Sequence, residues 1–397
     1  MRPLRVLYIH HAGPFGGASR SLLELIHSFP EGAVQPLVLT RRGQFLQILE
    51  AAHVETIGCG GVSQFDNSRY GFYRGMRWLI LLREIAYLPT TLWGLLAARR
   101  RWRQVDLVHI NDLTLIPPLW FARQVFACPV VVHVRGVQNT SSSRRGRALS
   151  SIVLRYADRL IAIDETVRRS LDPRLNAEVI HNGLRIVPDG DATERSAGKS
   201  LMIGMVGGLS RAKGCLEFLE AARICRDRGA DIRCVFVGQS MRTPSLLRDM
   251  ALRTLGLSQE IHGELQERIA ALELRECVEF WPFTTELDQV YRRLDLVCFP
   301  SHFDAPGRPI FEAAFFGIPS IAAISSPTPD TIVDGETGLT VKPRAPAALA
   351  DAIMCLYENP RRRLEMGRNA ARLAKANFDA RSNAARVLGI YRQLVQA

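Results

Sequence analysis

The stretch Phe299–Ala323, with the sequence FPSHFDAPGRPIFEAAFFGIPSIAA, constrains the fold of this chain more than any other part of it. The apolar run Leu294–Phe299 ends at a proline and is typical of a buried strand. A turn rich in proline and glycine follows, and Ile310–Phe316 predicts a short helix with Pro309 at its first position. Ser320–Ala323 predicts the next strand. The stretch therefore predicts a strand, a loop, a helix and a second strand.

Two acidic residues lie in this stretch, Asp304 in the loop and Glu312 in the first turn of the predicted helix. The start of a helix offers unpaired backbone N–H groups and the positive end of the helix dipole, which suit a phosphate. A carboxylate such as that of Glu312 can accept two hydroxyl hydrogen bonds, as a ribose would donate. The stretch is thus suited to a nucleotide.

The same stretch resembles the signature of the retaining glycosyltransferases of the glycogen-synthase-like family (glycosyltransferase family 4), which have the GT-B fold. The matching positions are Pro300-Ser301, Asp304, Gly307, Glu312-Ala313 and Gly317-Ile318-Pro319. Asp304 departs from the family pattern, which has Glu at this place. The alternative interpretation is an ordinary strand-loop-helix unit with incidental acids.

The length of 397 residues is too great for one hydrophobic core and predicts two domains of about 180 residues each. Hydrophobic residues make up 47% of the chain and charged residues 23%, as in globular proteins. The resemblance implies an α/β fold of the GT-B type, with two Rossmann-like doubly wound domains facing a cleft. We expect an acceptor-side domain over 1–185, a linker over 186–200, a nucleotide-sugar-binding domain over 201–378, and a C-terminal helix over 379–397 that packs back on the N-terminal domain.

The formal charge of +12 indicates an anionic partner, for which nucleic acid, anionic lipid and a nucleotide-sugar diphosphate all qualify. Neither a zinc-finger spacing nor an RNA-recognition motif occurs, so nucleic acid is not expected. The eight cysteines are scattered without a C-x-x-C pair and are expected to be reduced thiols of a cytoplasmic protein. The short apolar run Val6–Ile9 predicts no signal peptide.

A glycine-rich loop, Gly13–Arg20, follows the first predicted strand, Arg5–His10, and precedes a helix. Such a loop brings backbone close to a phosphate or a sugar. It lacks the G-x-G-x-x-G pattern, and no acid ends the second predicted strand at Val34–Thr40, which disfavours a dinucleotide. By the resemblance, Gly16 and Gly17 face the donor diphosphate; a plain tight turn is the alternative.

His133 lies near the end of the predicted strand Val130–Val134, at the sheet edge where doubly wound folds bind ligands. The resembled family often has a histidine here, near the donor sugar and the acceptor. The alternative is a packed histidine, which is also the role expected for His109. The Ser- and Arg-rich segment Thr140–Arg147 predicts a mobile loop for the acceptor.

The second domain opens with the predicted strand Leu201–Val206, followed by the loop Gly207–Gly214 and a helix from Cys215. In the resembled family, an arginine and a lysine of this loop bind the diphosphate. Lys213 matches the lysine, whereas Gly208 occupies the arginine position, so Arg211 is the alternative second cation. A cation at a helix start opposes the helix dipole and is explained by an anion between them; a solvated lysine is the alternative.

Segment 72–103 combines large apolar residues with the basic cluster Arg99–Arg103. Arg83, Glu84 and Pro89 argue against a membrane-spanning helix. The segment predicts amphipathic helices that lie on an anionic membrane surface. The alternative is that these helices only cover the sheet of the first domain.

The resemblance implies a retaining glycosyltransferase that moves a sugar from a UDP- or GDP-linked donor to a glycan or a lipid-linked acceptor, in cell-surface polysaccharide synthesis. The enzyme is expected in the cytoplasm or on the inner face of the membrane. No cofactor or metal is expected, because Lys213, helix termini and backbone N–H groups would stabilise the developing charge. The alternatives are a catalytically degraded partner protein and a sugar-nucleotide epimerase.

The expected site residues follow from the same resemblance. The catalytic residues are His133, Lys213 and Asp304. The donor-binding residues are Gly16, Gly17, Gly207, Gly208, Arg211, Lys213, Asp304, Gly307, Arg308 and Glu312.

Overall fold

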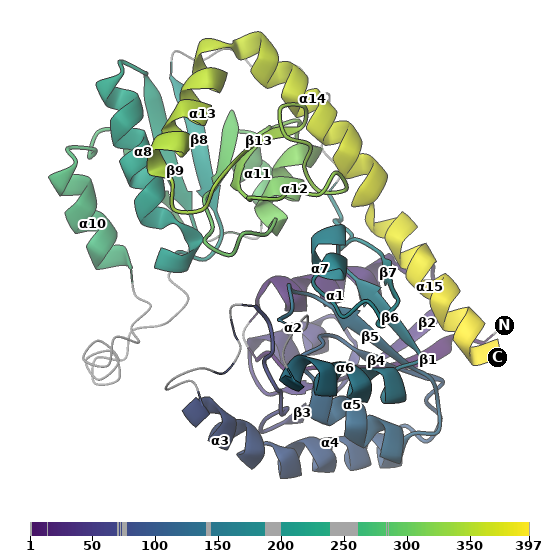
Figure 1. Ribbon diagram of the computed structural model, residues 1–397. Coiled ribbons are helices and arrows are strands. Elements are labelled where there is room, and N and C mark those ends of the chain that lie inside the picture. Colours follow the sequence, from purple (N-terminus) through teal and green to yellow (C-terminus); the bar gives the residue numbers. More distant parts are fainter. Residues whose placement is uncertain are drawn as a thin grey trace. The chain divides into compact units, whose positions relative to one another are not determined.

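The structure is a computed structural model, and it describes residues 2–13, 15–69, 71, 73, 78–139, 144–186, 200–238, 261–282, 284 and 286–396. The chain forms two compact units, each with its own sheet (Figure 1). The N-terminal unit comprises Met1–Arg185 and Asn377–Ala397, and the C-terminal unit comprises Ile186–Ala376. Most of the predicted linker, 187–199, lies outside the described residues.

Seven parallel strands form the sheet of the N-terminal unit, in the order β3-β2-β1-β4-β5-β6-β7. The strands are β1 (Leu4–His10), β2 (Val34–Arg41), β3 (Glu55–Cys59), β4 (Leu107–Ile110), β5 (Val130–Val134), β6 (Arg159–Ala162) and β7 (Ala177–Val179). Continuous apolar runs such as VVV in β5 suit parallel strands that are buried on both faces. The strand order reverses between β1 and β4, so the sheet is doubly wound.

Helices cover both faces of this sheet. One face packs on α1 (Gly17–Ser28), α2 (Gln44–Ala51) and α15 (Ala380–Gln396). The other packs on α4 (Leu88–Arg101), α5 (Ile116–Val125), α6 (Arg144–Tyr156) and α7 (Glu165–Arg169). The predicted acceptor loop is therefore partly helical, and 140–143 lie outside the described residues.

The last helix, α15, completes the N-terminal unit although the rest of that unit ends at Arg185. Val387 and Tyr391 of α15 are buried in its core, and the Tyr391 hydroxyl lies 2.7 Å from His109 Nδ1. The Leu184 N–H donates to the Phe378 carbonyl over 2.8 Å, so the two passages of the chain into this unit are hydrogen-bonded to each other.

Helix α3 (Trp78–Ala86) precedes α4, with only Tyr87 between them. Its apolar side chains are largely exposed, 61% for Leu79 and 65% for Leu82, whereas Glu84 is only 2% exposed. Taken as one helix, Trp78–Arg101 is long and apolar enough to cross a membrane by length and composition. Residues 72 and 74–77 of the predicted amphipathic segment lie outside the described residues.

The C-terminal unit has six parallel strands in the order β10-β9-β8-β11-β12-β13, which is again doubly wound. They are β8 (Leu201–Val206), β9 (Ile232–Val237), β10 (Val278–Trp281), β11 (Leu296–Phe299), β12 (Ser320–Ala323) and β13 (Gly338–Val341). The other elements are η2 (Arg211–Lys213), α8 (Cys215–Asp227), α10 (His262–Ala271), α11 (Leu287–Tyr291), α12 (Arg308–Phe315), α13 (Pro346–Glu358) and α14 (Pro360–Asn377). Residues of α8, α10 and α13 pack on one face of the sheet.

The predicted α/β fold with two doubly wound domains is confirmed, with several local differences. Helix α12 begins at Arg308, which makes Pro309 its second residue rather than its first. The segment Gly338–Val341, for which no strand was predicted, forms the edge strand β13 beside β12. All eight cysteines are free thiols, and six of them are buried.

Candidate functional site

The point where the strand order reverses in the C-terminal unit lies between β8 and β11, and ligands of doubly wound sheets bind at such points. The loops after these two strands are held together at short range. Gly214 has φ +81°, and a Cβ there would lie 2.0 Å from the Pro300 carbonyl oxygen, so only glycine allows this approach. The His302 N–H donates to the Ala212 carbonyl over 2.9 Å. Residues from both loops therefore share one site.

The amine of Lys213 lies within this site, over two aromatic rings. Its Nζ is 5.2 Å from the centre of the Phe299 ring and 5.1 Å from that of Phe303. Burial lowers the pKa of Lys213, because the charged form loses hydration. Within the described part of the chain, the amine forms no ion pair. An anion bound here would offset the loss of hydration.

The second predicted cation of this loop, Arg211, is engaged elsewhere. Its Nε donates to Glu264 of α10 over 2.8 Å, and its side chain is 74% exposed. Gly208 carries no side chain that could replace it. Gly207 has φ +128° with no heavy atom within 4 Å of a would-be Cβ, so its backbone is open to a ligand. The loop thus contributes one enclosed cation, Lys213, and exposed backbone.

Glu312 of α12 is 3% exposed and is held from two directions. Its Oε2 accepts from the Tyr291 hydroxyl over 2.8 Å, and its Oε1 accepts from Arg308 Nε over 3.0 Å. Each carboxylate oxygen can accept more than one hydrogen bond. The two bonds therefore fix the carboxylate and remain compatible with donors from a ligand.

Asp304 and Gly307 shape the approach to α12. Asp304 has φ +48°, and its Oδ1 accepts from the Ser325 N–H over 2.6 Å, which joins the loops after β11 and β12. Gly307 precedes α12, and a Cβ there would lie 2.3 Å from Cζ of Phe299. Gly307 is therefore required by the ring that also lies under Lys213. Lys213, Asp304, Gly307, Arg308 and Glu312 all belong to the C-terminal unit.

In the N-terminal unit, Gly16 and Gly17 lie at the start of α1, after β1. A Cβ at either position would meet no heavy atom within 4 Å, so packing does not require glycine here. Nearby, His10 is fixed between Ser19 Oγ at 2.9 Å and Asn111 Nδ2 at 2.8 Å. Hydrogen bonds of His10 thus hold the start of α1 beside the sheet, while no protein atom lies close to the Cβ positions of Gly16 and Gly17.

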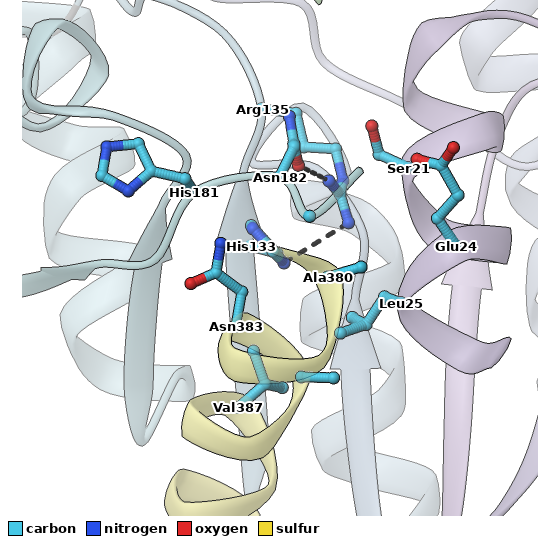
Figure 2. A pocket seen from close by; sticks show the side chains of 12 residues that line it. Ser21, Glu24, Leu25, His133, Arg135, His181, Asn182, Ala380, Asn383 and Val387 are labelled. Carbon is cyan, nitrogen blue, oxygen red and sulfur yellow. Dashed lines mark hydrogen bonds between the residues drawn. The ribbon is translucent and has the colours of Figure 1, made fainter. Parts of the chain in front are cut away.

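His133 is the fourth residue of β5, near the strand end as predicted, on the sheet face covered by α1 and α15 (Figure 2). Its Nδ1 is 3.4 Å from Nη2 of Arg135, and its buried Nε2 has no hydrogen-bond partner in the described structure. Burial and the nearby guanidinium hold the pKa of His133 well below its usual range, so the ring is neutral. Sequence alone could not decide which face of the sheet it occupies.

Arg135 is the polar centre of this region, and sequence reasoning assigned it no role. Its guanidinium donates to Asn111 over 2.8 Å and also to Asn182 (Figure 2). With His133, it lines a small pocket whose walls also include Ser21 of α1 and Asn383 of α15. Arg135 follows His133 by two residues at the end of β5, and this position was the sequence feature that could have indicated a role for it. Tyr291, which holds Glu312, gave no such signal because it lies in a different helix, α11.

In a comparison with known proteins, each half of the chain matches a protein-family model. Residues 190–373 match the family model of glycosyl transferases group 1, and residues 16–183 match that of the glycosyl transferase 4-like domain. A D-inositol 3-phosphate glycosyltransferase of Corynebacterium glutamicum is 27% identical, over 96% of this chain and 93% of its own length.

Two solved structures share the fold over nearly the whole chain. The Anabaena protein HepE, solved with UDP and glucose, has a TM-score of 0.72 at 20% identity and covers 98% of this chain and 100% of its own. The sucrose-phosphate synthase of Thermosynechococcus elongatus has a TM-score of 0.70 at 19% identity, covering 98% and 99%.

Proposed function

Because the chain belongs to the glycosyl transferases of group 1, which use nucleotide-sugar donors, we propose that it transfers a sugar to a glycan or lipid-linked acceptor with retention at the anomeric carbon. The C-terminal unit would bind the donor, and the N-terminal unit would bind the acceptor. Synthesis of a cell-surface polysaccharide is the process that this reaction would serve.

The enclosed amine of Lys213 carries the proposal. A half-buried cation with no carboxylate partner among the described residues, beside two loops at the switch point of the sheet, suits a diphosphate. When the bond between sugar and diphosphate breaks, charge develops on the leaving phosphate. Lys213 and the N–H groups at the start of α12 would stabilise that charge.

The other site residues take roles that agree with their surroundings. Glu312, fixed by Tyr291 and Arg308, would accept the ribose hydroxyls. Asp304 would bind hydroxyls of the donor sugar from its strained loop. HepE, which has the same fold, was solved with UDP, and this supports a UDP-sugar as the donor for this chain. A GDP-sugar is the alternative to test.

A second candidate is a catalytically inactive partner protein of the same fold. The absence of a side chain at Gly208, together with the engagement of Arg211 by Glu264, favours it because only one loop cation remains for the diphosphate. Slow hydrolysis of a nucleotide-sugar by the purified protein would contradict this candidate.

We further propose that α3 and α4 lie on an anionic membrane surface, which would place the enzyme on the inner face of the membrane. Exposed apolar side chains of both helices, including Leu82 at 65% and Trp93 at 58%, support this. The basic end of α4 would contact lipid headgroups.

The decisive experiment is a titration of UDP and GDP by calorimetry, followed by turnover of the matching nucleotide-sugar. Lys213→Ala should lower kcat by about a hundredfold, as removal of one such donor does elsewhere. Lys375→Ala, an exposed lysine on α14, is the matched control and should leave both quantities unchanged. Normal turnover of folded Lys213→Ala would contradict the assignment.

A further inference from the structure

The loop after β8 offers the proposed donor site one cation, Lys213, although a diphosphate carries more than one negative charge. Gly208 has no side chain, and the Arg211 guanidinium is paired with Glu264 of α10 over 2.8 Å. A second positive charge for the diphosphate would therefore have to come from another element of the C-terminal unit.

His302, in the loop after β11, lies against the loop that contains Lys213. Its backbone N–H donates to the carbonyl of Ala212, the residue before Lys213, over 2.9 Å. The residue after it, Phe303, has its ring centre 5.1 Å from the Lys213 amine. His302 therefore lies beside the residues around that amine, at the edge of the sheet where doubly wound folds bind ligands.

The side chain of His302 is bonded to a carboxylate in the first turn of α8. Its Nε2 lies 2.8 Å from Oε1 of Glu217, and the two side chains are 17% and 18% exposed. An ionised carboxylate accepts hydrogen bonds and donates none, so Nε2 of His302 carries the hydrogen in this pair. The other ring nitrogen, Nδ1, then has a hydrogen only when the ring is protonated and positively charged.

Nδ1 of His302 is open to a ligand. It has no hydrogen-bond partner within the described structure, and it is not enclosed by protein atoms, in contrast to Nε2 of His133. The oxygens of an ionised phosphate only accept hydrogen bonds, so such an oxygen can bond to Nδ1 only when the ring is charged. A phosphate at this position therefore selects protonated His302.

The surroundings of Glu217 also suit a positive neighbour. Its Oε2 is buried with no hydrogen-bond partner in the described part of the chain, so this oxygen has lost water without a replacement. With a neutral ring, Glu217 and His302 together carry one negative charge beside the donor site. With a protonated ring the pair is neutral overall, which removes the repulsion of a diphosphate.

The elements that contact His302 carry several other ionisable side chains. They are Glu217 and Cys215 of α8, Arg211 and Lys213 of η2, and Asp304 of its own loop. Cys215 stays a neutral thiol because burial raises its pKa to about 12. Burial lowers the pKa of Lys213, so this amine is the other group near His302 that can lose a proton as the pH rises. A test must therefore compare variants in which Lys213 is unchanged.

We propose that His302 binds the donor diphosphate through Nδ1 and takes up a proton from solvent when it does so. The proposal rests on the proposed function and adds a residue to the same site. Lys213 would hold the diphosphate from the loop after β8, and His302 from the loop after β11. The charged ring would then stabilise the leaving diphosphate as Lys213 does, in place of the cation that Gly208 lacks.

The test is a calorimetric titration of the full chain with UDP and with GDP, at about pH 6 and about pH 8, on either side of the usual range of a histidine. From the lower to the higher pH, the affinity of the unaltered protein should fall about fivefold more than that of His302→Gln, because the ring loses its charge. His302→Lys keeps a charge that does not titrate in this range, so it should bind more tightly than His302→Gln with the same weak pH dependence.

The matched control is His262→Gln, which removes the other histidine of the C-terminal unit, an exposed residue of α10. It should behave as the unaltered protein does. Titrations in two buffers with different heats of ionisation give the proton uptake on binding, which should be smaller for both His302 variants. The terminal phosphate of UDP or GDP also titrates near pH 6, at about the same value for every variant, so it does not affect the comparison.

Thermal unfolding without nucleotide shows which variants are folded, and His302→Lys alone suffices if His302→Gln is not. Equal pH dependence and equal proton uptake in the unaltered protein and the His302 variants would overturn the proposal. So would binding that is weakened by the same factor at both pH values, which is the effect of a purely structural contact with Glu217. A chain that binds neither nucleotide at either pH contradicts the proposed function itself.

Discussion

At the scale of single residues, the donor site depends on a carboxylate that the protein holds in place before any ligand arrives. Glu312 would be expensive to bury alone, and its bonds to Tyr291 and Arg308 compensate for lost hydration. A fixed acceptor loses little freedom when a ribose binds. The two hydrogen-bond donors therefore stabilise the buried carboxylate and, if Glu312 binds the ribose as proposed, would also hold it ready for the ligand.

Replacing Glu312 by alanine should weaken binding of the nucleoside diphosphate. A hydrogen bond to a charged group contributes about 1.5–3 kcal/mol, so a loss of tenfold or more is expected. Tyr291→Phe keeps the carboxylate and removes one of its fixing bonds, so its effect should be smaller. Calorimetry on folded proteins checks both. If Glu312→Ala binds as tightly as the unaltered chain, the ribose is held elsewhere.

Asp304→Glu should change which donor sugar is preferred while the nucleoside diphosphate still binds. The longer side chain moves its carboxylate by one methylene and displaces the bond to the Ser325 N–H. Asp334→Glu is the matched control, since Asp334 also accepts from a backbone N–H, that of Thr340, in the same unit. Turnover with a panel of UDP- and GDP-sugars measures the preference. An unaltered order of preference would remove Asp304 from sugar recognition.

Several site residues could be located from sequence because their chemistry is tied to local motifs. Lys213 and Glu312 each lie in or next to a loop that the sequence predicts from its glycines and prolines. The partners of these residues come from distant parts of the chain and carry no local signal. Tyr291 at Glu312 and Glu264 at Arg211 are such partners. His133 shares the sheet face of Val131, and which helices cover that face is likewise decided by distant parts of the chain, α1, α2 and α15.

At the scale of elements, α4 buries some of its apolar side chains and exposes others, whereas α3 exposes most of its own. Leu95 and Ala98 of α4 are fully buried against the sheet, whereas Trp93 and Leu96 point outward. Helix α4 therefore covers the sheet with one side, as the alternative interpretation from sequence expected, and presents apolar residues on the other. Its binding to a membrane surface stays a prediction. Helix α3 buries only Glu84 and is the more exposed of the two.

Changing Arg99, Arg100, Arg101 and Arg103 to Gln should weaken binding to vesicles that contain an anionic lipid. Each basic residue near such a leaflet contributes about 1 kcal/mol before screening by salt, so a loss of at least about tenfold is expected. Binding should also weaken as salt rises. Flotation with anionic and neutral vesicles measures both effects.

The matched control replaces four exposed arginines of α14, namely Arg361, Arg362, Arg368 and Arg372, by Gln. It changes the net charge equally in the C-terminal unit. Flotation that is the same for both quadruple variants, or that ignores lipid charge, would show that the basic end of α4 has no specific role at the membrane.

The edge strands β3 and β13 were not predicted from the sequence. Strand β3 has only one buried residue, Cys59, and its remaining residues are half-buried. Strand β13 also has one buried residue, Gly338, followed by three half-buried ones. Central strands such as β5 are fully buried and show the continuous apolar run that predicts them. An edge strand has a neighbour on one side only, so its sequence is less constrained.

At the scale of the whole molecule, three of the histidines that the N-terminal unit buries, His10, His109 and His133, affect how its stability depends on pH. Burial holds the pKa of each well below its usual value, with further lowering by the nearby Arg135. They are neutral in the folded unit and become protonated on unfolding below about pH 6.5. Stability is therefore fully present above that pH and falls as the solution is acidified.

Lowering the pH from about 7.5 to about 5.5 should cost roughly 1.4 kcal/mol per histidine in the free energy of unfolding. Denaturant unfolding at both pH values, followed by a probe in the N-terminal unit, measures the change. His109→Phe removes one titrating group and should reduce the difference by about a third. A free energy of unfolding that is equal at the two pH values would show that the histidines titrate normally in the folded chain.

The placement of α15 in the N-terminal unit determines the order in which the two units can complete their folding during synthesis on the ribosome. The first unit lacks Val387 and Tyr391 of its core until the last residues have been synthesised. Between Arg185 and Asn377 lie the residues Ile186–Ala376 of the second unit. At roughly 5–20 residues per second, they delay completion by some ten to forty seconds. The N-terminal unit, although its synthesis begins first, is therefore completed only after the C-terminal unit, and a nascent chain released before α15 is made would expose the sheet surface that α15 covers.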